Sequence, residues 1–287
     1  MNIRQAVSIH GLTLNVERWG SGVPLLALHG FTGCAAAWRN CLGDAGMTTE
    51  VVAVDLAGHG RSESPLELAY YRMPMVVASL VALLDQLALP RVALLGYSMG
   101  GRVALQFAVA HPERVVALLL ESASPGIADP GERAARQASD EALADRILRN
   151  GVPAFVAEWE ALPLFSSQAR LPAAMREAQR AQRLANNPLG LANSLRGMGA
   201  GAQAPVWEAL PLLTMPVVLL AGAEDEKYIG LARAMAARLP GAQVVVAPDA
   251  GHTIHLEQAQ VFRETVHRFL QVTGDQVVRS EGSVLWT

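Results

Sequence analysis

Lysine is almost absent from this chain of 287 residues, and cysteine is scarce. Lys227 is the only lysine, so arginine carries nearly all positive charge, and the formal net charge is −3. A near-neutral chain argues against nucleic-acid binding driven by bulk charge and leaves only a local basic cluster as a route to it. Cys34 and Cys41 fit no metal-ligand spacing and are too few for a disulfide framework. We therefore expect two plain, buried or half-buried thiols.

Long apolar runs are also missing. No run approaches the roughly 18 residues that a membrane-spanning helix needs. The first twenty residues alternate polar and apolar side chains and contain no signal-peptide apolar region. We therefore expect a soluble, cytoplasmic protein, either a monomer or a small homo-oligomer, with no membrane or nucleic-acid partner. Hydrophobic residues make up 51% of the chain, enough to bury a sizeable core.

Short apolar runs alternate with longer helical patterns over most of the chain. The first two runs, Val7–Ile9 and Leu12–Glu17, flank a His10-Gly11 turn and predict a β-hairpin. Continuously apolar strands that alternate with helices predict an α/β fold, with a mostly parallel central sheet flanked by helices on both faces. We expect further strands at Leu25–Leu28, Val51–Val54, Val92–Leu95, Val115–Leu120, Val217–Ala221 and Val244–Ala247, and helices that include Met75–Leu87, Arg102–Ala110 and Leu231–Leu239.

The alternation stops between the fourth and fifth of these strands. That stretch is rich in alanine, arginine and glutamine, is interrupted by prolines, and is typical of several short helices. Inserts longer than about 15 residues usually have their own structure and often a function. We therefore predict a core at residues 1–121 and 216–274, an inserted helical cap at 122–215, and a C-terminal tail at 275–287 to which we assign no function.

A G-x-S-x-G motif carries the clearest chemical signal. Gly96-Tyr97-Ser98-Met99-Gly100 follows an apolar strand directly and precedes a helical pattern, which is the context that a nucleophile elbow requires. Two glycines permit a tight turn that exposes the serine at the edge of the sheet. The Met99 N–H is then free at a helix N-terminus, where it can stabilise an oxyanion. The alternative is a glycine-rich turn with a passive serine.

A serine needs a histidine to take its proton, and the histidine needs an acid to orient it. His252 follows the last predicted strand, and Asp225 follows the strand before it. Both therefore lie at carboxyl ends of parallel strands, on the same edge as Ser98, in the chain order Ser, Asp, His that this fold uses. Glu224 is the alternative acid, and we expect His29 to shape its loop and not to transfer protons.

These motifs together resemble the α/β-hydrolase superfamily over nearly the whole chain. His29-Gly30-Phe31 and the segment from Asp55 to Ser62 belong to the resemblance, as do the elbow and the Asp225/His252 pair. In that superfamily the residue after the His-Gly pair, which is Phe31 in this chain, supplies the second N–H of the oxyanion hole. No P-loop, dinucleotide glycine pattern or metal-ligand set accompanies these motifs, so no cofactor or metal is implied.

Arginine distinguishes the chain from a generic esterase. Arg102 lies four residues after Ser98, about one helical turn into the elbow helix, and further arginines follow in the predicted cap. Burying an unpaired charge is costly, so arginines that converge on a pocket favour a substrate with several carboxylates. A solvated helix face is the alternative for any single cap arginine.

A closer resemblance includes the cap. The segments Gly96–Arg102, Glu132–Asp140 and Gly222–Lys227 are similar to the family of 2-succinyl-6-hydroxy-2,4-cyclohexadiene-1-carboxylate synthases of menaquinone biosynthesis, as are the motifs around Trp159 and Arg183. Cys34 and Ala185 depart from the family pattern and put the fine shape of the pocket in doubt. Position by position, the resemblance implies substrate-carboxylate arginines at Arg102, Arg136 and Arg183, and pocket aromatics at Tyr97, Trp159 and Phe165.

The resemblance implies a lyase, with a small polycarboxylate as its substrate. The enzyme would remove a proton next to the succinyl ketone of a cyclohexene carboxylate and expel pyruvate, with Ser98 acting as a base activated by His252. A carboxylesterase or carbon–carbon-bond hydrolase with the same triad is the alternative. A non-catalytic binding protein would need a broken triad, whereas the triad residues here are complete.

Overall fold

The computed structural model describes residues 3–43 and 49–282, with side chains up to Gln271. Eight strands form one sheet in the order β1-β2-β4-β3-β5-β6-β7-β8. The pairs β1/β2 and β2/β4 are antiparallel, and all other neighbours are parallel. The strands are β1 (Ile3–Ile9), β2 (Leu12–Gly20), β3 (Val23–Leu28), β4 (Thr49–Val54), β5 (Val92–Tyr97), β6 (Val115–Glu121), β7 (Val217–Gly222) and β8 (Gln243–Ala247).

The strand predictions are confirmed, with ends that differ by a few residues. The hairpin turns at His10 and Gly11, whose φ angles of 52° and 82° both lie in the left-handed region. Two such residues make the turn whose twist matches that of the paired strands. The hairpin strands are longer than predicted, because their outer ends pair in register as far as Ile3 and Arg18.

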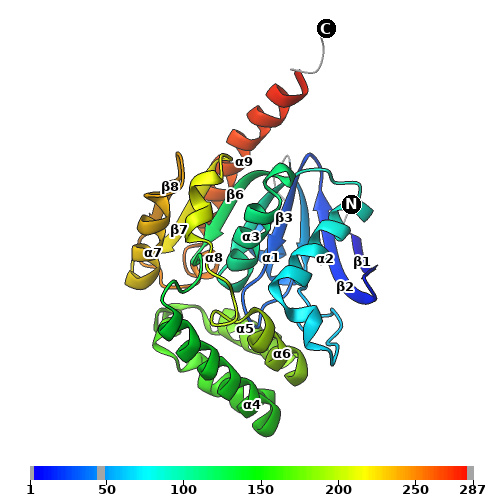
Figure 1. Ribbon diagram of the computed structural model, residues 1–287. Coiled ribbons are helices and arrows are strands. Elements are labelled where there is room, and N and C mark those ends of the chain that lie inside the picture. The colour runs from blue at the N-terminus through cyan, green and yellow to red at the C-terminus, as the bar shows by residue number, and fades with distance from the viewer. Residues whose placement is uncertain (1–2, 44–48, 283–287) are drawn as a thin grey trace.

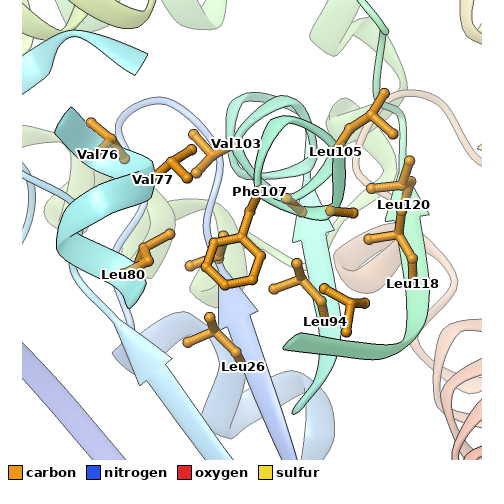
Figure 2. Packing of buried hydrophobic residues seen from close by; sticks show 14 of the residues in the cluster. Leu26, Val76, Val77, Leu80, Leu94, Val103, Leu105, Phe107, Leu118 and Leu120 are labelled. Atoms are coloured by element: carbon orange, nitrogen blue, oxygen red, sulfur yellow. The ribbon is translucent and has the colours of Figure 1, made fainter. Parts of the chain in front are cut away.

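Helices cover both faces of the sheet (Figure 1). Alternate strand residues point to opposite faces, so Leu26 and Leu94 pack beneath the helices of one face while Leu25 and Leu95 belong to the cluster on the other. In Figure 2, Phe107 of one helix lies over Leu26 at the centre of the first face. The first face is covered by α2 (Met73–Gln86), α3 (Met99–Ala110) and α7 (Glu226–Ala236), and the second by α1 (Ala36–Leu42) and α9 (Ala259–Gly282).

The segment between β6 and β7 contains only helices among its regular elements and lies against one end of the sheet (Figure 1). Its apolar residues, among them Ile147, Phe155 and Leu191, form a small cluster of their own. Leu210 near its end packs instead with the core of the sheet. The elements are α4 (Pro130–Glu160), η3 (Pro163–Arg170), α5 (Ala173–Leu184), α6 (Pro188–Met198) and η4 (Trp207–Leu212).

Two helices are longer than the sequence predicts. α4 spans 31 residues, although Gly151 interrupts its helical geometry at φ 80°, just before Pro153. α9 continues beyond residue 274, the predicted end of the core, as far as Gly282. Residues 283–287 of the predicted tail lie outside the described residues. Within the described chain, no helix is both long and apolar enough to cross a membrane.

Candidate active site

Ser98 sits at a strained turn between β5 and α3. Its φ of 49° and ψ of −106° are outside both helical and strand geometry, and such strain is typical of functional positions. The flanking glycines are needed for packing. A Cβ at Gly100 would approach the carbonyl oxygen of Leu28 to 2.2 Å, and one at Gly96 would approach that of Gly100 to 2.5 Å. The close approach of backbone to backbone therefore explains the motif.

The structure brings Ser98, His252 and Asp225 into one hydrogen-bonded chain. His252 Nε2 lies 2.9 Å from Ser98 Oγ, and Nδ1 lies 2.7 Å from Asp225 Oδ2. His252 and Asp225 are both buried. The second carboxylate oxygen of Asp225 accepts a hydrogen bond from the Tyr228 N–H at 3.4 Å, so the acid also caps helix α7. With Nδ1–H directed at the carboxylate, Nε2 is free to accept the serine proton.

The alternative acid and the other buried histidines have different partners. Glu224 is exposed and pairs with Arg170. His29 Nε2 accepts a hydrogen bond from the Leu56 N–H at 3.0 Å, which agrees with a role in shaping the loop. Burial lowers the pKa of His59 to about 3, so this histidine stays neutral. His255 is held by a fully buried glutamate, Glu121, at 2.9 Å.

The two predicted oxyanion-hole residues both line the cavity that contains Ser98. Met99 is the first residue of α3, where an N–H group has no acceptor within the helix. Phe31 lies in the loop after β3, and no described residue accepts a hydrogen bond from its N–H. Two backbone donors are thus available beside the serine, as stabilisation of an oxyanion or enolate requires.

The cavity around Ser98 has a volume of about 620 Å³ and receives two of the three predicted arginines. Arg136 of α4 lines it, but its Nε also donates to the buried Asp140 at 2.8 Å. Arg102 of α3 lines it without any carboxylate partner among the described residues. Its Nη1 donates to the Met198 carbonyl at 2.8 Å and to Gln203 Oε1 at 3.0 Å.

Of the three predicted arginines, Arg102 has the environment that most clearly favours binding of an anion. Burial lowers the pKa of its guanidinium to about 10, so the group is still charged near neutral pH. Neutral acceptors satisfy only part of the five N–H donors of a guanidinium. The buried Asp140 acts on Arg102 electrostatically without forming an ion pair with it. A desolvated cation without an ion-pair partner is costly, and a substrate carboxylate in the same cavity would offset that cost.

The third predicted arginine, Arg183, lines a different cavity. It does not line the Ser98 cavity; it lines a neighbouring one of about 410 Å³. Arg183 is buried, pairs with Glu160 at 3.1 Å and lies over the ring of Phe165. The two cavities share a wall of four aromatic residues, namely Phe31, Tyr97, Trp159 and Phe165. The three predicted pocket aromatics are thus all found there.

Three further residues near the triad are not among the predicted site residues. Glu257 accepts hydrogen bonds from the Gly251 N–H at 2.7 Å and the Thr253 N–H at 3.1 Å, on either side of His252. Lys227 and Tyr228 line the Ser98 cavity from the first turn of α7. Their positions, two and three residues after Asp225, are a signal that could have found them. Within the described ranges, no cluster of three or more histidine, cysteine or acidic residues could hold a metal ion.

The fold and this geometry define a serine-triad protein of the α/β-hydrolase type. Residues 23–259 match the family with the α/β hydrolase fold, and the chain belongs to that family. A putative 2-succinyl-6-hydroxy-2,4-cyclohexadiene-1-carboxylate synthase of Bacillus subtilis is 44% identical over 86% of this chain and 89% of the relative. The synthase of Klebsiella pneumoniae is 34% identical over 85% of this chain and 92% of its own length. The chain therefore belongs to the family of 2-succinyl-6-hydroxy-2,4-cyclohexadiene-1-carboxylate synthases.

Solved structures agree with this placement. MenH from S. aureus is 32% identical, with a TM-score of 0.86 over 90% of this chain and 98% of that protein. A thermophilic esterase from Thermogutta terrifontis with bound malate is 27% identical, with a TM-score of 0.82 over 95% of this chain and 99% of that protein. The same scaffold thus carries proteins named as esterases.

Proposed function

We propose that this chain is a lyase of menaquinone biosynthesis that eliminates pyruvate from a succinyl-enolpyruvyl-hydroxycyclohexene carboxylate. The product is 2-succinyl-6-hydroxy-2,4-cyclohexadiene-1-carboxylate, the compound for which its relatives are named. One observation of the site carries the proposal beyond family membership. The Ser98 cavity contains Arg102, a charged guanidinium with no carboxylate partner among the described residues, whereas a neutral ester offers no counter-charge.

The triad supplies the base in this reaction. His252 Nε2 takes the proton of Ser98 Oγ, and Oγ removes the proton next to the succinyl ketone. The electron pair moves onto the ketone oxygen to form an enolate, which the N–H groups of Phe31 and Met99 stabilise. Collapse of the enolate breaks the carbon–oxygen bond to the enolpyruvyl group. The leaving group takes up a proton at its methylene carbon and becomes pyruvate.

The cavity holds the substrate for this step. Arg102 and Arg136 face the same space as Ser98 and bind carboxylates, for which a guanidinium offers paired donors. Tyr97, Trp159 and Phe165 contact the ring system. Arg183 lies beyond the aromatic wall, so we assign it the carboxylate of the succinyl arm, which would have to pass between the aromatic rings.

A coupled assay of pyruvate release tests the proposal. The purified enzyme, mixed with the enolpyruvyl substrate, should release pyruvate together with the absorbance of the conjugated diene, in equal amounts. If a folded protein releases no pyruvate from the substrate, the proposal is contradicted.

The expectation of a cytoplasmic enzyme with no membrane or nucleic-acid partner stays a prediction.

An esterase or carbon–carbon-bond hydrolase is the second candidate, because the Thermogutta esterase shares the scaffold at a TM-score of 0.82. A hydrolase forms an acyl-enzyme on its serine. Intact-protein mass spectrometry of rapidly quenched reactions distinguishes the two. The lyase should show no added mass on Ser98 with its natural substrate, whereas a trapped acyl adduct would favour hydrolysis.

A further inference from the structure

Tyr228 lines the Ser98 cavity but belongs to neither the triad nor the arginine set. It lies in the first turn of α7, three residues after Asp225, and is half-buried. Its N–H donates to Asp225, which also holds His252. The backbone of Tyr228 is therefore fixed by the same carboxylate that orients the catalytic histidine.

The Tyr228 ring is held against His252. The two rings meet edge to face, with centroids 4.6 Å apart and an angle of 60° between their planes. Tyr97 and Phe165 contact the same imidazole at longer centroid distances of 5.6 and 6.2 Å. The position of the phenol group is thus set by packing before any substrate binds, and preorganised groups bind ligands at a lower entropic cost.

The hydroxyl group of Tyr228 has no hydrogen-bond partner among the described residues, and it lies within electrostatic reach of the arginines. Burial raises the pKa of Tyr228, while Arg102 and Arg136 act against that rise. Because the phenol stays protonated, it is a neutral donor in the same cavity as Arg102, a cation with no ion-pair partner in the part of the chain that the structure describes.

We propose that Tyr228 is a specificity-determining residue whose hydroxyl group donates a hydrogen bond to the substrate carboxylate bound by Arg102. Arg102 supplies the positive charge, and Tyr228 supplies one further donor without adding charge to the cavity. The combination fits a carboxylate, which is an acceptor only, better than a neutral ester. The inference rests on the proposed function, since it names a contact to the polycarboxylate substrate of that reaction.

Tyr228→Phe tests the contact, because it removes one oxygen atom and keeps the ring against His252. A hydrogen bond to a charged group contributes enough that kcat/KM for pyruvate release should fall about 10- to 100-fold. The equilibrium Kd for the same substrate, measured in the non-reacting Ser98→Ala background, should rise by a similar factor. Tyr70→Phe is the matched control, because Tyr70 donates to His10 in the hairpin turn, away from the cavity.

The outcomes separate this inference from the proposed function. A Tyr228→Phe enzyme with kcat/KM and Kd within twofold of the parent overturns the inference and leaves the lyase activity in place. A fall in kcat with an unchanged Kd also overturns it, because the hydroxyl group would then not bind the carboxylate. If the parent enzyme releases no pyruvate although its Ser98→Ala form binds the substrate, it is the proposed function that fails.

Discussion

Replacement of Arg102 by alanine is the sharpest test of how this cavity selects its substrate. The guanidinium lies in the cavity with Ser98 and has only neutral hydrogen-bond partners, Met198 O and Gln203 Oε1, among the described residues. A bound carboxylate would therefore be its main counter-charge. Removing one partner of a desolvated charge pair typically costs about 2–5 kcal/mol. We expect kcat/KM for pyruvate release to fall by about 30-fold to several thousand-fold.

The same substitution should have a smaller effect on stability. It removes two hydrogen bonds, each with a net contribution of about 0.5–1.5 kcal/mol, but it also removes a cation that is costly to bury. These effects oppose each other, so the melting temperature should move by only a few degrees while the activity falls steeply. Thermal unfolding measured beside kinetics separates the two. If part of the Arg102→Ala protein is unfolded, its kcat/KM should be calculated per folded molecule before it is compared with that of the parent.

The pH dependence provides an independent check on Arg102. Its pKa, lowered to about 10, means that the guanidinium is charged below that pH and loses its proton above it. The KM for the polycarboxylate should therefore rise as pH passes through about 10, and this rise should be absent in Arg102→Ala. The linkage to stability has the opposite sign. The folded-state pKa is lowered, so the unfolded state binds more protons above about pH 10, and the free energy of unfolding should rise with pH there.

The other two arginines and a surface arginine complete the experiment. Arg136 and Arg183 already pair with Asp140 and Glu160, so a substrate carboxylate would share these cations with a protein carboxylate. We expect large losses for both alanine variants, and smaller ones than for Arg102→Ala. Arg149 on α4 is exposed and donates only to a backbone carbonyl of its own helix, so Arg149→Ala should change kcat/KM by less than about fivefold. Full activity in all three alanine variants would refute the proposal that these arginines bind the carboxylates of the substrate.

Three further predictions concern the triad, the thiols and the single lysine. Ser98→Ala should lower the rate by on the order of 10³-fold or more while the fold is retained. Asp225→Asn should be similarly damaging, because His252 loses its orienting acceptor. Near-normal turnover in a folded Ser98→Ala protein would disprove the assignment of Ser98 to the triad. Burial raises the pKa of Cys34 to about 11 and that of Cys41 to about 12, so both thiols should react with iodoacetamide at pH 7.5 far more slowly than free cysteine, and rapid alkylation would contradict this. Acetylation of amines should modify Lys227 and the chain N-terminus only. Because it removes a positive charge from the cavity wall, it should raise the KM for the substrate about two- to fivefold. Complete modification with an unchanged KM would show that the charge of Lys227 does not contribute to substrate binding.

The sheet and the triad could be predicted because their signals are local in the sequence. A buried parallel strand is a continuous apolar run, and the elbow needs glycines at fixed positions around Ser98 for steric reasons. Ser98 follows β5, Asp225 follows β7 and His252 follows β8, and because these strands are parallel all three residues lie at one edge of the sheet. Their mutual hydrogen bonds follow from topology and need no knowledge of distant packing.

The partners of charged groups could not be predicted in this way. Nothing near Arg183 in the sequence shows that Glu160, 23 residues earlier, pairs with it. Nor does the sequence show that Arg183 lines a different cavity from Ser98, with Phe165 in the wall that the two cavities share. The end of helix α9 could not be predicted from the sequence either. Gly274 marks the predicted end of the core, but one glycine costs a helix only about 1 kcal/mol relative to alanine, and α9 continues through it. These features depend on the whole fold.

The structure explains how one triad can serve both hydrolysis and elimination on this scaffold. Ser98, His252 and the two N–H donors form a device for moving a proton and stabilising an oxygen anion, and neither task specifies whether the serine attacks a carbonyl or removes a proton. The choice lies with whatever holds the substrate. A carboxylate bound to Arg102, one helical turn from Ser98, would fix which substrate atom faces the serine oxygen. The reaction is therefore decided by the walls of the cavity, and we expect variants of Arg102 and Tyr228 to change substrate preference before they change the chemistry of the triad.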